Sequence, residues 1–162
     1  MSTTTIIAWT DHTANFWLGC TKVSEGCRNC YAETLTKNRM GLNVWGPKAS
    51  RQIAKGVWKE VPRWNRNASP GVLGRNNPRL VFVGSLMDWA EDRPDLVEPR
   101  QRMWETIREC RHLHFQMLTK RPENISKFLP DDWGDGWKNV WLGTSIEDMR
   151  VAWRAECLAR IP

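Results

Sequence analysis

Arg79-Leu-Val-Phe-Val-Gly84 is a run of apolar residues between Pro78 and Gly84, and it decides the fold class. A short apolar run between turn residues is typical of a buried β-strand. Two shorter runs of the same kind follow, Phe115-Gln-Met-Leu118 and Val140-Trp-Leu-Gly143. The sequence therefore predicts three buried strands in the second half of the chain.

Segments with helical spacing of apolar residues separate and follow these strands. Residues 97–111 predict a helix, and residues 122–129 predict a short helix with proline in its first turn. Residues 146–160 predict a final helix. The apolar residues that we expect to face the core are Val97, Met103, Trp104, Ile107 and Cys110 in the first helix, and Ile146, Met149, Trp153 and Leu158 in the last.

The first half of the chain is less regular. Residues 5–9 and 16–18 resemble short extended segments, and residues 31–40 predict a helix that ends at Gly41. Residues 41–78 contain Gly, Pro, Asn and basic residues with isolated aromatic ones. This composition predicts a basic insertion that is rich in loops.

Strands that alternate with helices predict βαβ units and a parallel sheet. Counting the segment before the cysteines, the chain holds about four β/α units. We therefore expect an α/β fold, a partial (β/α) barrel, in a single domain over residues 1–162. Because the chain stops after a helix, where another strand should follow, we expect a truncated form of a longer protein.

The composition is that of an ordinary soluble protein, with a net charge of +6 and a pI of about 9.3. A net positive charge permits binding to a phosphate-bearing partner but does not require it. No apolar run is long enough to span a bilayer and no signal peptide is evident, so the expected location is the cytoplasm, with no membrane contact. The 11 tryptophans favour a Trp-rich core over a base-stacking surface.

The segment Gly19–Glu33 holds Cys20, Cys27 and Cys30 in the spacing C-x6-C-x2-C. Structural zinc takes four protein ligands, so three close thiols without an obvious fourth suit it poorly. A [4Fe–4S] cluster held by three thiolates would keep one iron open for a ligand. The remaining cysteines, Cys110 and Cys157, lie at helix-like positions and are expected to be buried apolar residues.

Polar side chains follow each predicted strand. In parallel α/β folds, ligands bind at the carboxyl ends of the strands, so these side chains are candidates for a pocket. Each also has a structural interpretation, as a helix cap or a solvated charge. The candidates are Ser85, Asp88, Thr119, Lys120, Arg121, Thr144, Ser145, Glu147 and Asp148.

Several of these segments are similar to those of a known superfamily. Asn15–Cys20, Gly26–Ala32, Met117–Pro122 and Leu142–Ile146 resemble radical S-adenosylmethionine proteins of the spore-photoproduct-lyase-like type. The whole chain resembles the phage Gp37/Gp68 family, whose members carry the same three-cysteine motif and have no assigned function. The spacing here is longer than the C-x3-C-x2-C that is usual in the superfamily.

The resemblance implies a bound [4Fe–4S] cluster on Cys20, Cys27 and Cys30. It implies S-adenosylmethionine as the second cofactor and radical chemistry on an unidentified substrate, with a nucleic acid or nucleotide as the suggested class. The residues expected near cofactor or substrate are Tyr31, Ser85, Asp88, Thr119, Lys120, Thr144 and Ser145. A three-Cys-motif partner protein and a bacterial or phage-infected host cell are also implied.

Two other hypotheses stay open. In the first, the cysteines bind zinc with a fourth ligand such as His12, Cys110 or His114, and the basic, Trp-bearing segment 41–78 contacts nucleic acid. In the second, the protein keeps the metal loop but serves as a non-catalytic interaction protein. Metal analysis and cofactor cleavage would separate the three hypotheses.

Overall fold

The computed structural model describes residues 5–70 and 79–162 of the chain. Its main sheet has four parallel strands in the order β1-β4-β5-β6: His12–Ala14, Arg79–Val83, Leu113–Thr119 and Val140–Thr144. Each strand lies beside the one before it in the sheet, as successive β/α units predict. The expected α/β fold with a parallel sheet is therefore confirmed.

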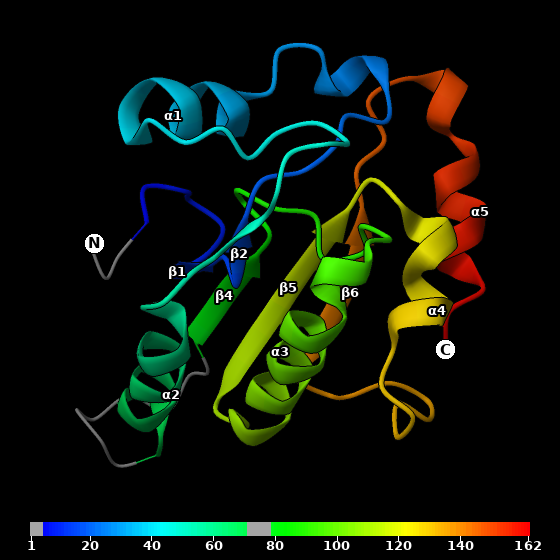
Figure 1. Ribbon diagram of the computed structural model, residues 1–162. Helices are drawn as coiled ribbons and strands as arrows, with labels where there is room; N and C mark the ends of the chain where they lie inside the picture. Colours follow the sequence, from blue (N-terminus) through cyan, green and yellow to red (C-terminus); the bar gives the residue numbers. More distant parts are fainter. Residues whose placement is uncertain (1–4, 71–78) are drawn as a thin grey trace.

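The helices are α1 (Tyr31–Met40), α2 (Val57–Ala68), α3 (Val97–Glu109), α4 (Ile125–Phe128) and α5 (Trp153–Ala159). Within the described residues, four short 3-10 turns accompany them, at Glu25–Cys27, Pro94–Leu96, Pro122–Asn124 and Met149–Val151. A small antiparallel pair is formed by β2 (Trp17–Leu18) and β3 (Gln52–Ile53). Helices α2 and α3 lie against one face of the sheet, whereas α1 and the cysteine segment lie beyond the upper ends of the strands (Figure 1).

The two faces of the sheet differ in what covers them. In β5, Leu113, Phe115 and Met117 are fully buried, whereas the alternate residues are half-buried. Residues in register share a face, so the buried row joins the core formed with α2 and α3. On the opposite face, Thr13, Phe82 and Leu118 line a cavity.

Two expectations about the first half of the chain are wrong. The first strand spans His12–Ala14 and not residues 5–9, because the chain turns there, with Thr10 N–H donating to the Ile7 carbonyl. Segment 41–78 contains the helix α2. Its basic residues and the internal Pro62 obscure the helical pattern in the sequence. Its buried residues recur at helical intervals: Val57, Val61, Trp64 and Ala68.

The last predicted helix is also shorter than expected. Asp148 caps the turn Met149–Val151, and α5 begins only at Trp153. Of the residues expected to face the core, Ile146, Met149 and Trp153 are exposed, whereas Leu158 packs against the core. The inward residue is Arg154, because its guanidinium donates to the Ser145 carbonyl and pairs with Glu147.

The other helical predictions are confirmed within a few residues. Helix α1 ends at Gly41, whose φ of 66° is the left-handed conformation expected of a C-terminal glycine. Helix α3 buries Met103, Trp104 and Ile107, and Cys110 follows it in the core, whereas Val97 is exposed. None of the helices in the described ranges combines the length and apolar character that crossing a membrane would need.

Candidate functional site

The cysteine segment follows β2 at the carboxyl end of the main sheet. Gly19 fixes where it begins, because its N–H donates to the Leu86 carbonyl at 3.0 Å. A Cβ at Gly19 would lie 2.1 Å from the Val44 carbonyl oxygen, and its φ of 105° is unfavourable for other residues. Only glycine lets the chain pass this point between two other loops.

The three cysteines line one cavity of about 1300 Å³. Cys27 is buried, and Cys20 and Cys30 are half-buried. Cys27 closes the turn Glu25–Cys27, and Cys30 is the residue from which α1 starts. Within residues 5–70 and 79–162, no group of three or more His, Cys, Asp or Glu side chains is gathered in a form that could hold a metal ion.

Most of the other predicted site residues line the same cavity. It is bounded by the ends of β4 and β5, the start of α1 and the segment after β6. Thr144 is absent from its lining, because its hydroxyl turns back to donate to the Thr119 carbonyl. The predicted residues that line it are Tyr31, Ser85, Asp88, Thr119, Lys120 and Ser145.

Asp88 is held by the protein on both carboxylate oxygens. One oxygen accepts from the Thr119 hydroxyl at 2.6 Å and from the Ala90 N–H at 3.0 Å. The other accepts from the Lys120 N–H at 3.1 Å and from the Arg121 guanidinium at 2.8 Å. With its acceptors engaged and only 6% of the residue exposed, Asp88 organises the strand ends.

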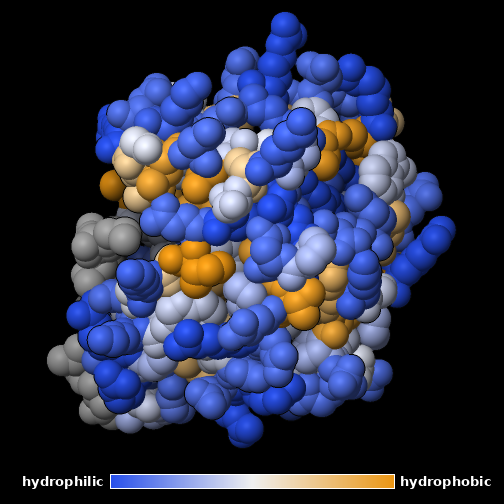
Figure 2. Space-filling model, in the orientation of Figure 1, coloured by the Kyte–Doolittle hydropathy of each residue, from blue (hydrophilic) through white to orange (hydrophobic). Residues whose placement is uncertain are grey.

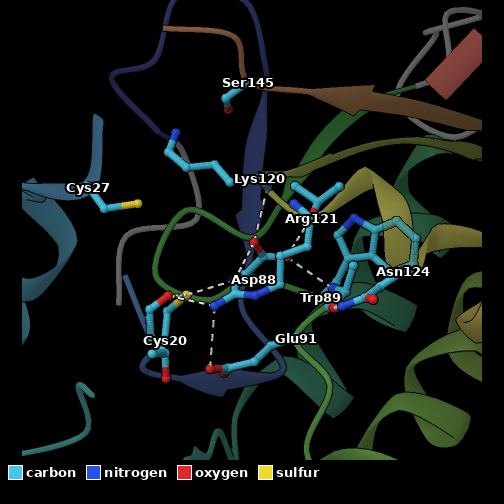
Figure 3. Close-up of polar contacts among 12 residues, drawn as sticks. Cys20, Cys27, Asp88, Trp89, Glu91, Lys120, Arg121, Asn124 and Ser145 are labelled. Carbon is cyan, nitrogen blue, oxygen red and sulfur yellow. Dashed lines mark hydrogen bonds and ion pairs between the residues drawn. The ribbon is translucent and has the colours of Figure 1, made fainter. Parts of the chain in front are cut away.

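Arg121 connects this strand end to the first cysteine (Figure 3). Its Nη1 lies 3.4 Å from the Cys20 Sγ, and its Nη2 donates to the Thr21 carbonyl. Burial alone would lower the pKa of Arg121, but the nearby Asp88 and Cys20 raise it above its usual range. The guanidinium therefore stays charged beside the thiol.

A second buried ion pair lies next to the first. Arg51 donates from Nε and Nη2 to the two oxygens of Glu91, at 2.8 and 2.7 Å, and both side chains are at most 4% exposed. Arg51 also donates to the carbonyls of Val44 and Ala49, so it holds the loop that leads into β3. Glu91 lies 3.7 Å from Arg121, which joins the two pairs into one network.

The Cys20 thiol is strongly affected by these surroundings. Burial raises its pKa to about 12, and the carboxylates of Asp88 and Glu91 add to the rise, against the opposing charge of Arg121. Metals and clusters bind the thiolate, so a bound metal would have to displace a tightly held proton.

Tyr31 and Ser85 meet at the wall of the cavity. The Tyr31 hydroxyl donates to the Ser85 carbonyl at 2.7 Å, and Ser85 Oγ accepts from the Asn15 side chain at 2.8 Å. Asn15 also accepts from the Leu86 N–H at 2.7 Å. Burial and the neighbouring Cys30 raise the pKa of the Tyr31 phenol above its usual range. These contacts tie α1 and the end of β1 to the segment after β4.

Lys120 and the segment after β6 close another side of the site. Lys120 Nζ lies 2.8 Å from one Glu147 oxygen, and Arg154 donates to the other at 2.8 Å. Burial alone would raise the pKa of Glu147, but these two cations hold it below its usual range. The Ser24 hydroxyl lies 3.4 Å from the same carboxylate. Glu147 thus links the cysteine segment to β5 and α5.

The cavity continues beneath α1, away from this network. Tyr31, Leu35 and Arg39 recur at intervals of four and all line it, so they form one face of the helix. A helix of this length is about 15 Å long, which indicates how far the cavity extends along it. Trp9, whose ring lies 4.8 Å from that of Phe82, lines the cavity from the sheet side. Figure 2 shows apolar surface beside and below α1 within a mainly hydrophilic face.

In segment 41–78, the tryptophans of residues 41–70 are buried or half-buried. Trp64 is 7% exposed and stacks on His12 at 4.3 Å, and Trp58 packs against Phe16. Trp45 donates its indole N–H to Thr36 at 2.6 Å. These tryptophans and Arg51 belong to the interior, which supports the expectation of a Trp-rich core. Residues 71–78 of the segment lie outside the described ranges.

Sequence reasoning missed three residues that organise the site: Asn15, Arg51 and Glu91. Arg121 and Glu147 belong to the polar segments that follow the predicted strands, but the sequence did not predict their ion pairs. Glu91 gave only a weak positional signal, because it lies eight residues after the end of β4. Arg51 gave no such signal, since it lies in the segment with least pattern.

No curated protein matches the chain, and no solved structure matches it. A family model described as "Protein of unknown function (DUF5131)" matches residues 4–162. Because the match covers nearly the whole sequence, including the cysteine segment and all four strands of the main sheet, the chain belongs to the DUF5131 family.

Proposed function

We propose that this protein is an iron–sulfur enzyme of the radical S-adenosylmethionine type, built on a partial (β/α) barrel. Cys20, Cys27 and Cys30 would hold a [4Fe–4S] cluster, and S-adenosylmethionine would bind beside it. The observation that carries the proposal is the single cavity: the three thiols and six predicted cofactor residues line it at the carboxyl ends of parallel strands.

The size and donor set of the cavity fit these groups. Its volume of about 1300 Å³ exceeds the 300–1000 Å³ that is ordinary for one small ligand, so a cluster and a second molecule could share it. Thiolates that bind different irons of a cluster lie farther apart than thiolates on one zinc ion. The three thiols line the same cavity, as the ligands of one cluster would have to.

The sheet supports the barrel part of the proposal. Its strands are all parallel and follow chain order, which is the arrangement of successive units in a (β/α) barrel. Helices cover one face, and Thr13, Phe82 and Leu118 line the cavity on the other. In a barrel, that second face is the interior.

The protein's own residues would bind and orient the cofactors. Lys120 and Ser145 face the cavity from the ends of β5 and β6, where Lys120 could exchange Glu147 for the carboxylate of a bound ligand. Asp88 and Thr119 would act indirectly, by fixing Lys120 and Arg121. When bound, the cluster supplies the electron and S-adenosylmethionine the reactive group.

The substrate would occupy the part of the cavity beneath α1. Arg39 and Lys55 line it and form no ion pair among the described residues, whereas Trp9 and Tyr31 offer aromatic surface. A nucleotide or nucleic acid combines a flat ring with phosphate, and it is the substrate class we would test first. A three-Cys-motif protein is the partner we would test first.

Anaerobic reconstitution followed by iron and sulfide quantification tests the proposal. We expect about four irons per chain and an EPR signal of the reduced protein that changes when S-adenosylmethionine is added. Replacing Cys27 by Ser should abolish both, whereas Cys157→Ser, remote from the cavity lining, should leave both unchanged. One zinc per chain, or an iron–sulfur signal that is indifferent to S-adenosylmethionine, would reject the proposal.

A further inference from the structure

Arg121 reaches from the end of β5 to Cys20, 101 residues earlier in the chain. Its Nη1 lies 3.4 Å from the Cys20 sulfur and 2.8 Å from an Asp88 oxygen. Its Nη2 donates to the carbonyl of Thr21, the residue next to that cysteine, at 2.5 Å. The guanidinium therefore contacts both the Cys20 side chain and the backbone of the cysteine segment.

The orientation of Arg121 is set by groups other than the cysteine. Its backbone N–H donates to the Thr119 hydroxyl at 2.9 Å, and that hydroxyl donates to Asp88. Asp88 and Glu91 hold the charged end from two sides, at 2.8 and 3.7 Å. The side chain is 7% exposed, so the donor aimed at Cys20 is fixed before any metal binds.

The three cysteines differ in the hydrogen-bonding partners of their sulfur atoms. Among the described residues, the Cys27 sulfur has one hydrogen-bonding partner, the Ser24 hydroxyl at 3.8 Å. In the described residues, Arg121 is the one charged group that forms a hydrogen bond with a cysteine sulfur. A charged donor to a ligating sulfur stabilises the more negative, reduced state of an iron–sulfur cluster and so raises its reduction potential.

We infer that Arg121 positions Cys20 and, by donating a hydrogen bond to its sulfur, raises the reduction potential of the cluster bound there. Arg121 is a positioning residue, since it acts through Cys20. The inference rests on the proposed function, because it requires a cluster on this cysteine. It goes further by assigning to one residue the control of how readily the cluster accepts an electron.

Two variants and a matched control test the inference. Arg121→Lys keeps a positive charge beside Asp88, and Arg121→Gln removes it. Arg51→Lys is the control, because Arg51 belongs to the same buried network and contacts Glu91 but no cysteine sulfur. Each protein would be reconstituted anaerobically, and its cluster titrated with redox mediators while the reduced EPR signal is followed.

We expect a shift to lower potential in both Arg121 variants, larger for Gln than for Lys, and no comparable shift in Arg51→Lys. Equal shifts in all three variants would mean that the buried network as a whole, and not the hydrogen bond from Arg121, sets the potential, and would overturn the inference. Unchanged potentials in both Arg121 variants would also overturn it.

A second measurement needs no substitution. Protein prepared with arginine labelled with 15N in the guanidinium should give a nitrogen coupling in pulsed EPR of the reduced cluster. A cluster without such a coupling would defeat the assignment of Arg121 and leave the proposed function standing. Failure of the unaltered protein to form a cluster would instead defeat the proposed function itself.

Discussion

The side chain of Glu147 packs directly against the backbone of Gly26, in the middle of the cysteine segment. A Cβ built at Gly26 would lie 2.4 Å from both Cγ and Cδ of Glu147. Glu147 cannot easily retreat, because Lys120 and Arg154 both hold its carboxylate at 2.8 Å. A residue after the last strand therefore determines how closely the cysteine segment approaches the sheet.

Replacing Gly26 by Ala should lower the free energy of unfolding by about 1–3 kcal/mol, because the methyl group must displace Glu147 from its two cations. In the background of Glu147→Ala, the same substitution should cost much less, since the obstructing atoms are gone. Chemical denaturation of the four proteins measures both effects. Equal costs in the two backgrounds would show that the contact does not restrain the loop.

Gly19→Ala should destabilise the protein more than Gly46→Ala does. Both glycines have a φ close to 100°, at 105° and 98°, so the conformational cost is similar. Only at Gly19 would the new Cβ also meet a backbone atom, the Val44 carbonyl oxygen at 2.1 Å, whereas nothing lies within 4 Å at Gly46. Urea denaturation curves should separate the two variants, and coincident midpoints would refute the explanation.

The Glu91–Arg51 pair should make stability depend on pH in the acid range. Burial alone raises the pKa of Glu91, but the hydrogen bonds from Arg51 and Thr21 and the nearby guanidinium charges outweigh it, so the pKa is lowered. Because the folded-state pKa lies below the unfolded value of about 4.3, this stabilisation is present above that pH. It is lost as the pH falls through the folded-state pKa.

Glu91→Gln should therefore be less stable at pH 7, by about 3–5 kcal/mol, because Arg51 loses its buried partner. The variant should also lose less stability than the unaltered protein between about pH 4 and lower pH. Thermal unfolding at a series of pH values gives both quantities. Glu156→Gln is a suitable control, since Glu156 lies on the exposed side of α5. Parallel pH profiles for Glu91→Gln and the unaltered protein would contradict the role given to Glu91.

Cys20 should be slow to react with iodoacetamide in the folded, metal-free protein. Burial raises its pKa to about 12 from the model-compound value of 9.0. At pH 8 this leaves roughly a thousandfold less thiolate than an ordinary cysteine has, and the thiolate is the reactive form. Mass spectrometry of timed samples gives the rate at each cysteine, with the urea-unfolded protein as reference. Similar rates for Cys20 in the folded and unfolded states would mean that the thiol is not shielded.

The sequence alone determined the regular elements whose signals are local. The apolar runs that became β4, β5 and β6 lie where the sequence predicted them, because one face of each strand packs into the core. Helix α1 and its end at Gly41 followed from local rules for helix termini. The three cysteines identified the candidate site, since closely spaced thiols are chemically distinctive.

Only the tertiary structure decided how the site is held together. Arg121 and Cys20 are 101 residues apart, and Arg51 and Glu91 are 40 apart, so no local pattern could pair them. A charged residue in a sequence favours solvent unless a partner is known, so sequence reasoning assigned neither Arg51 nor Arg121 a buried partner. The fold supplied the partners by bringing the carboxyl ends of the parallel strands to one edge of the sheet. There, burial makes each unpaired charge too costly to leave without its counterion.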